Sequence, residues 1–496
     1  MAKETFPLVG SITSRSGQAA EYWYFNPPDW SAAVVDQGFK NGVFDVVTNA
    51  VTGRATPCIR AVPQFGASSY PSGVSDNIRA VMLWTGASDA IVSATDATNS
   101  TIYSNSSSIG AITGKVKYFS ETTISGVANF VATADSNRAW FYPSGGALTE
   151  ITDGDFPPKQ GTPLTITGNF VHMDGFAFIG CTNGQIWNSD LNSLSAWTST
   201  SYVTCSSKPD GLVGIVRYKD LIVGLGKASI DYFYNAGNAV GSPLSRVSSG
   251  SANIGCINAD SICAFGETVA FIGAPSSGGS IGVYVLDGQS AKKISPAAVD
   301  DFITGRDVTT FKMNVIAPYG KFLLFVQEID GFGILFDPDT KLWTYYQPTI
   351  GIKQTALIIA NMIGGGSNTR VYTLSAGGTT RVLYMDAANG YEPMYMQIGP
   401  MDSGSMDYKT CNEFRLIGDV SSPTSTATAY ISYSDNDGTT WSTERAITFA
   451  SGGSFNNKLT RLGRYRRRFY RIRMPYTGFG SVLPPRLHAV EMDIAA

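Results

Sequence analysis

FVHMDGFAFIG (170–180) is the clearest copy of a unit that recurs as IVRYKDLIVGLG (215–226), ICAFGETVAFIG (262–273) and VIAPYGKFLLFV (315–326). Each copy begins as an apolar strand, passes through a tight polar turn and continues into a strongly apolar strand. Short apolar runs separated by turn residues are typical of β-hairpins. The sequence therefore predicts an all-β chain built from a repeated hairpin.

The spacing of the copies indicates which repeat architecture they build. Weaker copies start at Phe130 and Leu357, so the successive starts lie 40, 45, 47, 53 and 42 residues apart. A propeller blade of four short strands takes about 40–50 residues. The stretch IRAVMLWTGASDAIVSA (78–94) opens a further blade in this interpretation. We predict a β-propeller of six or seven blades, and a long β-sandwich or β-solenoid with coincidental spacing is the alternative.

Within each unit, the polarity of the segments matches the expected order of strands in a blade. Third segments such as SIDYFYNAG (229–237) and FGILFDPDT (332–340) are apolar. Fourth segments such as AKKISPA (291–297) and KLWTYYQP (341–348) are more polar. Inner strands are covered by neighbouring blades, whereas an outer edge strand meets water. We therefore expect each blade to end in a polar outer strand.

The sequence changes character on both sides of the repeats. Residues 1–75 are rich in turns, with WYFNPPDW (23–30) dense in proline and aromatic residues, which indicates an extended N-terminal arm. Residues 396–496 contain alternating segments such as TATAYISYS (426–434), typical of a β-sandwich with one solvated face. We predict an arm at 1–75 that forms part of a platform, a propeller at 76–395, and a C-terminal sandwich or platform domain at 396–496.

Composition excludes several classes of protein. Charged residues make up 15% of the 496 residues, below the usual share of about 25%, and hydrophobic residues make up 43%, which excludes a disordered chain. The net charge of −3 disfavours a nucleic-acid coat held by counterion release. Six scattered cysteines without a CxxC pair favour reduced, buried thiols. No long apolar run or secretory signal is present, so we expect a soluble chain without a membrane segment, synthesised in the cytoplasm.

Two motifs that resemble functional loops are better explained as turns. YSDNDGTTWS (433–442) resembles the Asp-box hairpin turn but has Asn436 where the motif has aspartate. We expect it to stabilise a hairpin through bonds between side chains and backbone. It lacks the later glutamate of a calcium loop. VGLGKAS (223–229) lacks the residue spacing of a phosphate loop.

The sequence contains few side chains that are candidates for catalysis. The two histidines, His172 and His488, each lie in an apolar segment without a triad or metal-ligand companion nearby in the sequence. Carboxylate pairs stay open as glycosidase candidates, because the two acids of such a site need not be close in sequence. Examples of such pairs are Asp153 with Asp155 and Asp300 with Asp301. We predict that the protein is not an enzyme and has no catalytic residues, metal site or cofactor.

KLTRLGRYRRRFYRIRMP (458–475) is the most basic stretch, with eight Lys and Arg residues interleaved with aromatic residues. Three interpretations are open. In the first, the stretch contacts nucleic acid through phosphate pairing and stacking. In the second, it binds acidic groups of a neighbouring subunit. In the third, it forms a solvated sheet face with internal ion pairs. The candidate subunit or DNA contacts are Arg464, Arg466, Arg467, Arg468, Arg471 and Arg473.

Several segments resemble the propeller-containing tail hub, or nozzle, proteins of podoviruses, which include the packaged-DNA stabilization protein group and the tail tubular protein B group. The segments that carry the resemblance are residues 248–274, GVYVLDGQSAKKIS (282–295), AAVDDFIT (297–304), RLGRYRRRFYRIRM (461–474) and PPRLHAVEMDI (484–494). The likeness spans most of the chain as a diffuse pattern.

The resemblance implies a structural component of a short-tailed bacteriophage tail, located in the virion. It implies a homo-oligomeric ring, a hexamer, below the portal and the tail adaptor, or head-to-tail connector. The ring would extend the DNA channel, retain packaged DNA and take part in genome ejection. Tail fibre or needle proteins are further implied partners. The alternatives are a glycan-binding or glycan-degrading propeller of the receptor-binding type and a general propeller scaffold.

Overall fold

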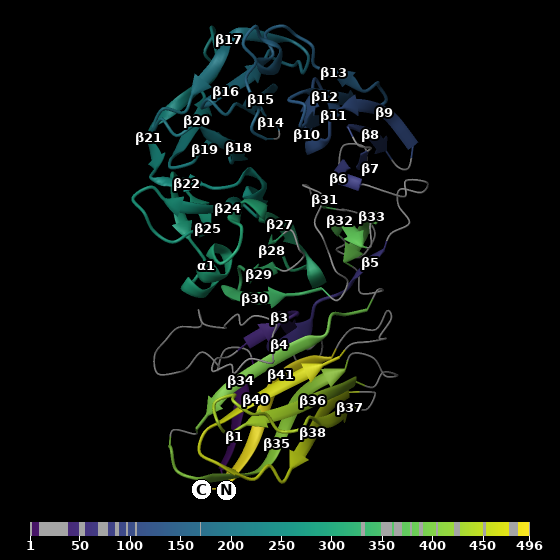
Figure 1. Ribbon diagram of the computed structural model, residues 1–496, viewed down its shortest axis with the longest axis vertical. Coiled ribbons are helices and arrows are strands. Elements are labelled where there is room, and N and C mark those ends of the chain that lie inside the picture. The colour runs from purple at the N-terminus through teal and green to yellow at the C-terminus, as the bar shows by residue number, and fades with distance from the viewer. Residues whose placement is uncertain are drawn as a thin grey trace.

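The chain folds almost entirely into β-strands, arranged as a ring of small sheets above a pair of larger sheets (Figure 1). The computed structural model describes residues 2–8, 38–48, 55–67, 78–84, 89–95, 98–104, 107–168, 170–328, 333–348, 360–361, 370–376, 379–385, 390–402, 405–420, 427–449, 453–475 and 485–495. The single α-helix within these ranges is α1 (Ala297–Thr304). The segment WYFNPPDW (23–30) lies outside the described residues.

Seven small antiparallel sheets form the ring in the described part of the chain, and we number them as blades 1 to 7. The strands of blades 1 to 3 are β6 (Ile78–Trp84), β7 (Asp89–Thr95), β8 (Asn99–Ser104) and β9 (Ser107–Thr113), then β10 (Val116–Ile124), β11 (Val127–Ala134), β12 (Ala139–Pro143) and β13 (Thr149–Glu150), then β14 (Val171–Met173), β15 (Phe176–Gly180), β16 (Gln185–Ser189) and β17 (Trp197–Thr204). The strands of blades 4 to 6 are β18 (Leu212–Tyr218), β19 (Leu221–Gly226), β20 (Ile230–Asn235) and β21 (Leu244–Ala252), then β22 (Ile254–Cys256), β23 (Cys263–Phe265), β24 (Thr268–Pro275), β25 (Gly282–Asp287) and β26 (Ser290–Lys293), then β27 (Lys312–Ile316), β28 (Leu323–Gln327), β29 (Gly333–Asp337) and β30 (Leu342–Tyr346). The prediction of a β-propeller is confirmed.

Blade 7 combines strands from two distant parts of the sequence. β31 (Ala360–Asn361), β32 (Arg370–Ala376) and β33 (Thr379–Met385) pair in chain order, and β5 (Phe65–Ala67) adds the fourth strand by pairing with β33. Strands β31, β32 and β33 also contact β6 of blade 1. A strand that precedes blade 1 therefore completes the last blade, so that backbone hydrogen bonds close the ring.

Three of the repeated hairpins lie at the starts of blades, and the copy that starts at Leu357 begins outside the described residues. The copies at 170–180, 215–226 and 315–326 coincide with the first two strands of blades 3, 4 and 6. The weak copy at Phe130 lies instead on β11 and β12, the second and third strands of blade 2. The first strand, β10, alternates between buried and exposed positions, whereas β11 is buried at its last six positions. Because the apolar run on β11 is stronger than that on β10, the hairpin predicted to start blade 2 was placed one strand too late.

The expectation of a polar outer strand is wrong for blade 6. In blade 5 the outer strand β26 has the sequence SAKK, and its side chains are exposed or half-buried, as expected. In blade 6 the outer strand β30 is buried at all its positions. The reason is that β2 (Gly38–Lys40) pairs with β30 in parallel, with Lys40 opposite Tyr345. β2 then pairs on its other side with β34 (Met394–Met401), which extends the sheet to nine strands.

Below the ring, two sheets pack face to face as a β-sandwich (Figure 1). One sheet contains β1 (Ala2–Pro7), β3 (Gly42–Thr48), β4 (Ala55–Ala61), β35 (Lys409–Val420), β38 (Gly453–Thr460), β39 (Arg464–Tyr465) and β41 (Arg486–Ala495). The other is formed by β34, β36 (Ala427–Ser434), β37 (Arg445–Phe449) and β40 (Arg468–Met474). Phe414 from the first sheet and Tyr470 from the second meet with ring centroids 4.5 Å apart in a shared apolar core. The predicted sandwich is therefore present.

Asn41 holds the junction between the two parts. Its amide nitrogen donates to the carbonyl oxygens of Gln347 (2.9 Å) and Pro393 (3.0 Å), and its amide oxygen accepts from the backbone N–H of Gln347 (2.7 Å). The side chain is buried, and its backbone φ of 58° lies in the left-handed region. One residue therefore connects the end of blade 6, the segment before β34 and the turn between β2 and β3.

Replacing Asn41 is expected to weaken this junction. Asn41→Ala removes three side-chain hydrogen bonds and places a Cβ-bearing residue without them at positive φ, so it should lower the free energy of unfolding by about 3 kcal/mol. Asn41→Gly loses the same bonds but adopts the backbone conformation freely, so its loss should be about 1 kcal/mol smaller. Urea unfolding followed by tryptophan fluorescence measures both values. Equal stability of the two variants and the parent chain would contradict this role.

Candidate functional site

The arginine-rich stretch forms the centre of one sheet of the sandwich. β40 lies between β34 and β36, and its register places Ile472 opposite both Met396 and Ile431. Tyr470, Ile472 and Met474 alternate along β40 and face the shared core. Because side chains of a strand alternate between its two faces, Arg471 and Arg473 lie on the opposite face.

Arg468 is buried within its own chain. Its guanidinium donates two hydrogen bonds to the Asp435 carboxylate, with Nε to Oδ1 at 2.6 Å and Nη2 to Oδ2 at 2.7 Å. The guanidinium also lies over the rings of Tyr433 and Tyr465. Burial is the largest single influence and disfavours the cation, but Asp435 and Tyr470 together outweigh it and raise the pKa of Arg468 above its usual value. The side chain is 0% exposed and cannot reach a partner molecule.

Three further arginines are also engaged by groups of the same chain. Arg473 donates to both carboxylate oxygens of Glu444, at 2.9 and 2.6 Å. Arg471 donates to Gln397 (3.0 Å) and lies 3.7 Å from the ring centroid of Trp441, and burial lowers its pKa to about 10. The Nε of Arg467 lies 3.2 Å from Asp437 Oδ1, in an ion pair without hydrogen-bond geometry.

The Asp-box-like turn supplies two of these carboxylates. Ser434 Oγ accepts from the backbone N–H of Gly438 (2.9 Å), and Asn436 Oδ1 accepts from that of Thr440 (2.9 Å). These bonds hold the tight hairpin expected from the sequence. They also point Asp435 and Asp437, on either side of Asn436, toward Arg468 and Arg467.

Arg464 and Arg466 differ in exposure from the other four candidate arginines. Both are exposed, and in the described part of the chain neither lies within ion-pair distance of a carboxylate. Their guanidinium carbons lie 5.1 and 4.4 Å from the ring centroid of Tyr408, which is 53% exposed beside the exposed Met406. We call Met406, Tyr408, Arg464 and Arg466 the Tyr408 patch.

The buried Lys409 holds the Tyr408 patch together. Its ammonium donates to the carbonyl oxygens of Ser405, Asp407 (3.2 Å) and Arg466 (3.3 Å), so the loop before β35 is tied to the arginine segment. The patch lies at the end of the sandwich that carries both chain termini, because Thr410 pairs with Arg464 and with Ala495 (Figure 1). Sequence reasoning missed Met406 and Tyr408, since neither belongs to a recognisable motif.

The other residues singled out in the sequence have structural partners. Asp153 accepts from the backbone N–H groups of Asp155 (2.8 Å) and Trp197 (3.3 Å). Asp300 is buried and accepts from the hydroxyls of Ser295 (2.6 Å) and Ser280 (3.0 Å). Both carboxylates are thus held by hydrogen bonds within the chain.

Metal-ligand clusters and membrane-spanning helices are absent from the described residues. These residues contain no group of three or more His, Cys, Asp or Glu side chains that could hold a metal ion. None of their helices has the length and hydrophobicity to cross a bilayer. All six cysteines are free thiols, of which Cys205 and Cys263 are only half-buried.

His488, on β41, links the neighbouring strands β35 and β4 of the same sheet. Its Nε2 lies 2.8 Å from Asp419 Oδ2, and its Nδ1 lies 3.1 Å from the carbonyl oxygen of Pro57. The bond with Asp419 raises the pKa of His488 above its usual value, although burial and the nearby Arg486 oppose the shift. The pKa of His172 is instead lowered, by burial and by Arg217.

The fold and the site together define a propeller joined to a sandwich that carries an exposed patch of arginine and tyrosine. Residues 85–326 match the family model Phage_stabilise, described as bacteriophage P22 Gp10, beta-propeller. The resemblance to phage tail hub proteins that the sequence predicted is therefore confirmed over these residues.

One curated relative supports the match. The tail hub protein gp10 of Salmonella phage P22 is 31% identical over 120 residues, which make up 22% of this chain and 24% of that protein. The aligned part thus spans about a quarter of the relative's length.

Solved structures show only a weak overall likeness. BBS1N in complex with ARL6DN is 12% identical, with a TM-score of 0.40 over 66% of this chain and 98% of that one. BamB from Moraxella catarrhalis is 9% identical, with a TM-score of 0.37 over 71% and 100% of the two chains. Similarity of this size bears on neither function nor assembly.

Arg468 and Arg466 should respond differently to replacement. Arg468→Ala is expected to lower the free energy of unfolding by about 3 kcal/mol, because it removes a desolvated cation that makes two hydrogen bonds. Arg466→Ala should change it by less than about 1 kcal/mol, because the side chain is exposed and has no ion-pair partner in the described part of the chain. Urea unfolding of the two single variants measures the difference. Similar losses of unfolding free energy in the two variants would contradict the difference in burial between Arg468 and Arg466.

The stability of the folded chain should depend on pH through the protonation of His488. A histidine whose folded pKa is raised contributes stability that is complete below its unfolded pKa of about 6.5 and is lost as the pH rises through the folded pKa. His488→Gln should therefore lower the thermal unfolding midpoint at about pH 6 more than at about pH 8.5.

His172→Gln is the matched control for this measurement. The folded pKa of His172 is lowered, so its protonation in the unfolded chain costs stability as the pH falls. Its removal should therefore act in the opposite direction at low pH. An effect of His488→Gln that does not depend on pH would exclude the proposed bond between His488 and Asp419 as its source.

Proposed function

We propose that this chain is a structural component of a short-tailed bacteriophage tail, and not an enzyme. It forms a homohexameric ring, the hub or nozzle, below the portal and the adaptor. The ring extends the DNA channel, retains packaged DNA and takes part in genome ejection. The observation that carries this proposal is the match of residues 85–326 to the phage P22 Gp10 propeller family. The protein would be made in the host cytoplasm and act in the virion.

We propose a division into a propeller, residues 76–395, and a platform formed by residues 1–75 together with 396–496. Strand pairing supports the shared platform, because β1 and β4 pair with β41. Strand β5, from the first segment, is assigned to the propeller because it pairs in blade 7.

The Tyr408 patch fits a contact with another protein subunit. Arginine, tyrosine and methionine are enriched in the buried centres of protein interfaces. Arg464 and Arg466 present planar cations that can form bidentate bonds with carboxylates of a neighbouring chain. The patch lies at the end of the sandwich opposite the propeller, where an adaptor or a second hub subunit would dock (Figure 1).

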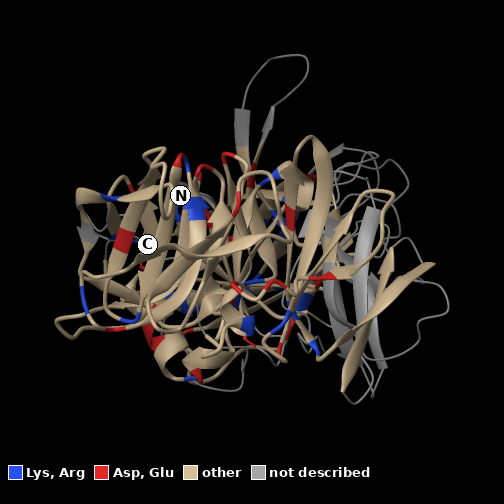
Figure 2. Cartoon of the chain, turned by 90° about the horizontal axis from the view of Figure 1, so that it is seen from above, with Lys and Arg blue, Asp and Glu red and all other residues tan. Residues whose placement is uncertain are grey.

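Charge distribution supports protein contact over DNA contact for the arginine stretch. Four of its six candidate arginines are engaged by side chains of the same chain, which leaves few cations for phosphates. Basic and acidic residues are interspersed over the described ribbon, as Figure 2 shows. A surface without a concentrated positive field would let exiting DNA pass without adhering.

The double variant Arg464→Ser/Arg466→Ser tests the proposed contact. It removes two exposed cations without touching the buried Arg468, so the fold should be retained while assembly is lost. Introduced into the phage genome, it should yield particles that lack the hub, as measured by protein content and negative-stain imaging. Lys117→Ser/Lys292→Ser is the matched control, because it removes two exposed cations from the propeller.

Two outcomes would count against this assignment. Variant particles with a complete hub and full DNA content would show that Arg464 and Arg466 make no needed contact. Particles that contain the hub but lose DNA would favour contact with DNA in the channel over contact between subunits.

A further inference from the structure

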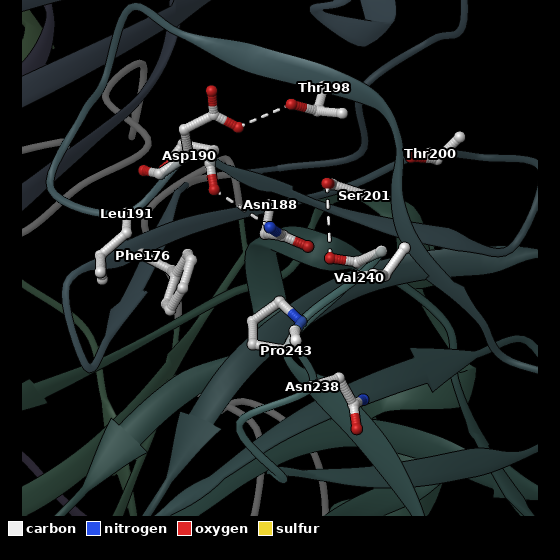
Figure 3. Close-up of a pocket in the computed structure, with 13 residues that line it drawn as sticks. Phe176, Asn188, Asp190, Leu191, Thr198, Thr200, Ser201, Asn238, Val240 and Pro243 are labelled. Atoms are coloured by element: carbon white, nitrogen blue, oxygen red, sulfur yellow. Dashed lines mark hydrogen bonds between the residues drawn. The ribbon is translucent and has the colours of Figure 1, made fainter.

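A pocket of about 430 Å³ opens between blades 3 and 4. It is formed by the ends of β15 and β16, by β17 and by the connection from β20 to β21 (Figure 3). These loops lie on the propeller, away from the arginine stretch and the sandwich (Figure 1). The pocket is thus independent of the Tyr408 patch.

Asn188 presents an unpaired acceptor to this pocket. The side chain is only 2% exposed, and its amide nitrogen donates to the carbonyl oxygen of Ser189 at 3.0 Å. Its amide oxygen is buried and has no hydrogen-bond partner among the residues that the structure describes. Figure 3 shows this oxygen on the side of the amide that faces Ser201 and Val240. A rotated amide would set oxygen against the Ser189 carbonyl, so the observed orientation is the favourable one.

Asp190 and Thr200 add to the polar lining. Asp190 Oδ1 accepts from the hydroxyl of Thr198 at 2.8 Å, which leaves Oδ2 without a partner among the described residues. The hydroxyl of Thr200 lines the same pocket and is likewise unengaged in the described part of the chain. A buried acceptor without a donor is unfavourable, so a ligand that donates to Asn188 would recover this loss.

The remaining lining determines the class of ligand. Phe176 and Pro243 supply apolar surface beside the polar groups (Figure 3). No Lys, Arg or His lines the pocket, and Asp190 is its one acidic residue. Phosphates, sulfates and carboxylates would therefore lack a cation to bind and would be repelled by Asp190. A neutral ligand rich in hydroxyl donors, with one apolar face, meets all of these conditions.

We propose that the pocket between blades 3 and 4 binds a neutral saccharide unit. Sugar hydroxyls would donate to Asn188 Oδ1 and Asp190 Oδ2 and accept from Thr200, while the C–H face of the ring would lie against Phe176. Cleavage is not part of the proposal, because glycoside hydrolysis uses two carboxyl groups and the pocket has one. The proposal stands on the pocket alone and does not require the tail-hub role.

Saturation-transfer NMR on the full-length chain tests the proposal. The probes are glucose, galactose, mannose and N-acetylglucosamine, with glucose 1-phosphate as the anionic comparison. At least one neutral sugar should give a saturable signal, and glucose 1-phosphate should bind more weakly than glucose. A second arm uses a neutral bacterial surface polysaccharide. Stronger binding of the polymer than of its monomers would identify a cell-surface glycan, rather than a free sugar, as the source.

Three variants complete the experiment. Asn188→Leu and Asp190→Ala should each weaken binding by roughly tenfold, because each removes one acceptor. Asn188→Leu also removes an unpaired buried acceptor, so a retained melting temperature separates lost binding from lost folding. Asp220→Ala, at a fully exposed carboxylate on blade 4, is the control and should bind as the parent chain does.

Specific results would overturn the proposal. These are the absence of a signal from every sugar and polysaccharide, binding that the Asn188 and Asp190 variants leave unchanged, and equal binding of glucose and glucose 1-phosphate. Loss of another tail protein from particles carrying these variants, with sugar signals unchanged, would instead identify a protein-docking site.

Discussion

The pairing of β2 with β30 is the contact on which the arrangement of propeller and sandwich depends. The outer strand of a blade leaves N–H and C=O groups that need partners. In blade 6 these groups meet β2, and Asn41 binds the adjacent backbone of Gln347 and Pro393. One nine-stranded sheet therefore runs from the propeller into the sandwich. The two parts are joined by a continuous hydrogen-bonded ladder and not only by covalent connections.

Ion pairs within the chain hold the strands of the sandwich together. The cations of β40 are matched by carboxylates of the turn after β36 and by Glu444, so most of the arginine stretch stabilises its own sheet. Arg464 and Arg466 remain exposed beside Tyr408. Internal pairing thus leaves two of the six candidate arginines, Arg464 and Arg466, without an ion pair among the described residues.

Local patterns predicted much of this fold and little of its sites. Apolar hairpins separated by polar turns identified the blades, because each strand needs an apolar face wherever it pairs. The burial of β30 was not predictable, since its covering strand lies about 300 residues earlier in the sequence. The partners of Arg468 and Arg473 likewise depend on strand register. The unpaired oxygen of Asn188 becomes evident only when the loops of two blades meet.

The sequence by itself determined an all-β repeat chain, a propeller followed by a sandwich, and a likeness to phage tail hub proteins. These properties follow from composition, period and polarity, which act over a few residues or one repeat. Tertiary structure alone decided that β5 closes blade 7, that β2 joins the two parts, and which arginines stay exposed. Each of these outcomes requires segments far apart in the chain to find a common register, which local physical chemistry does not specify.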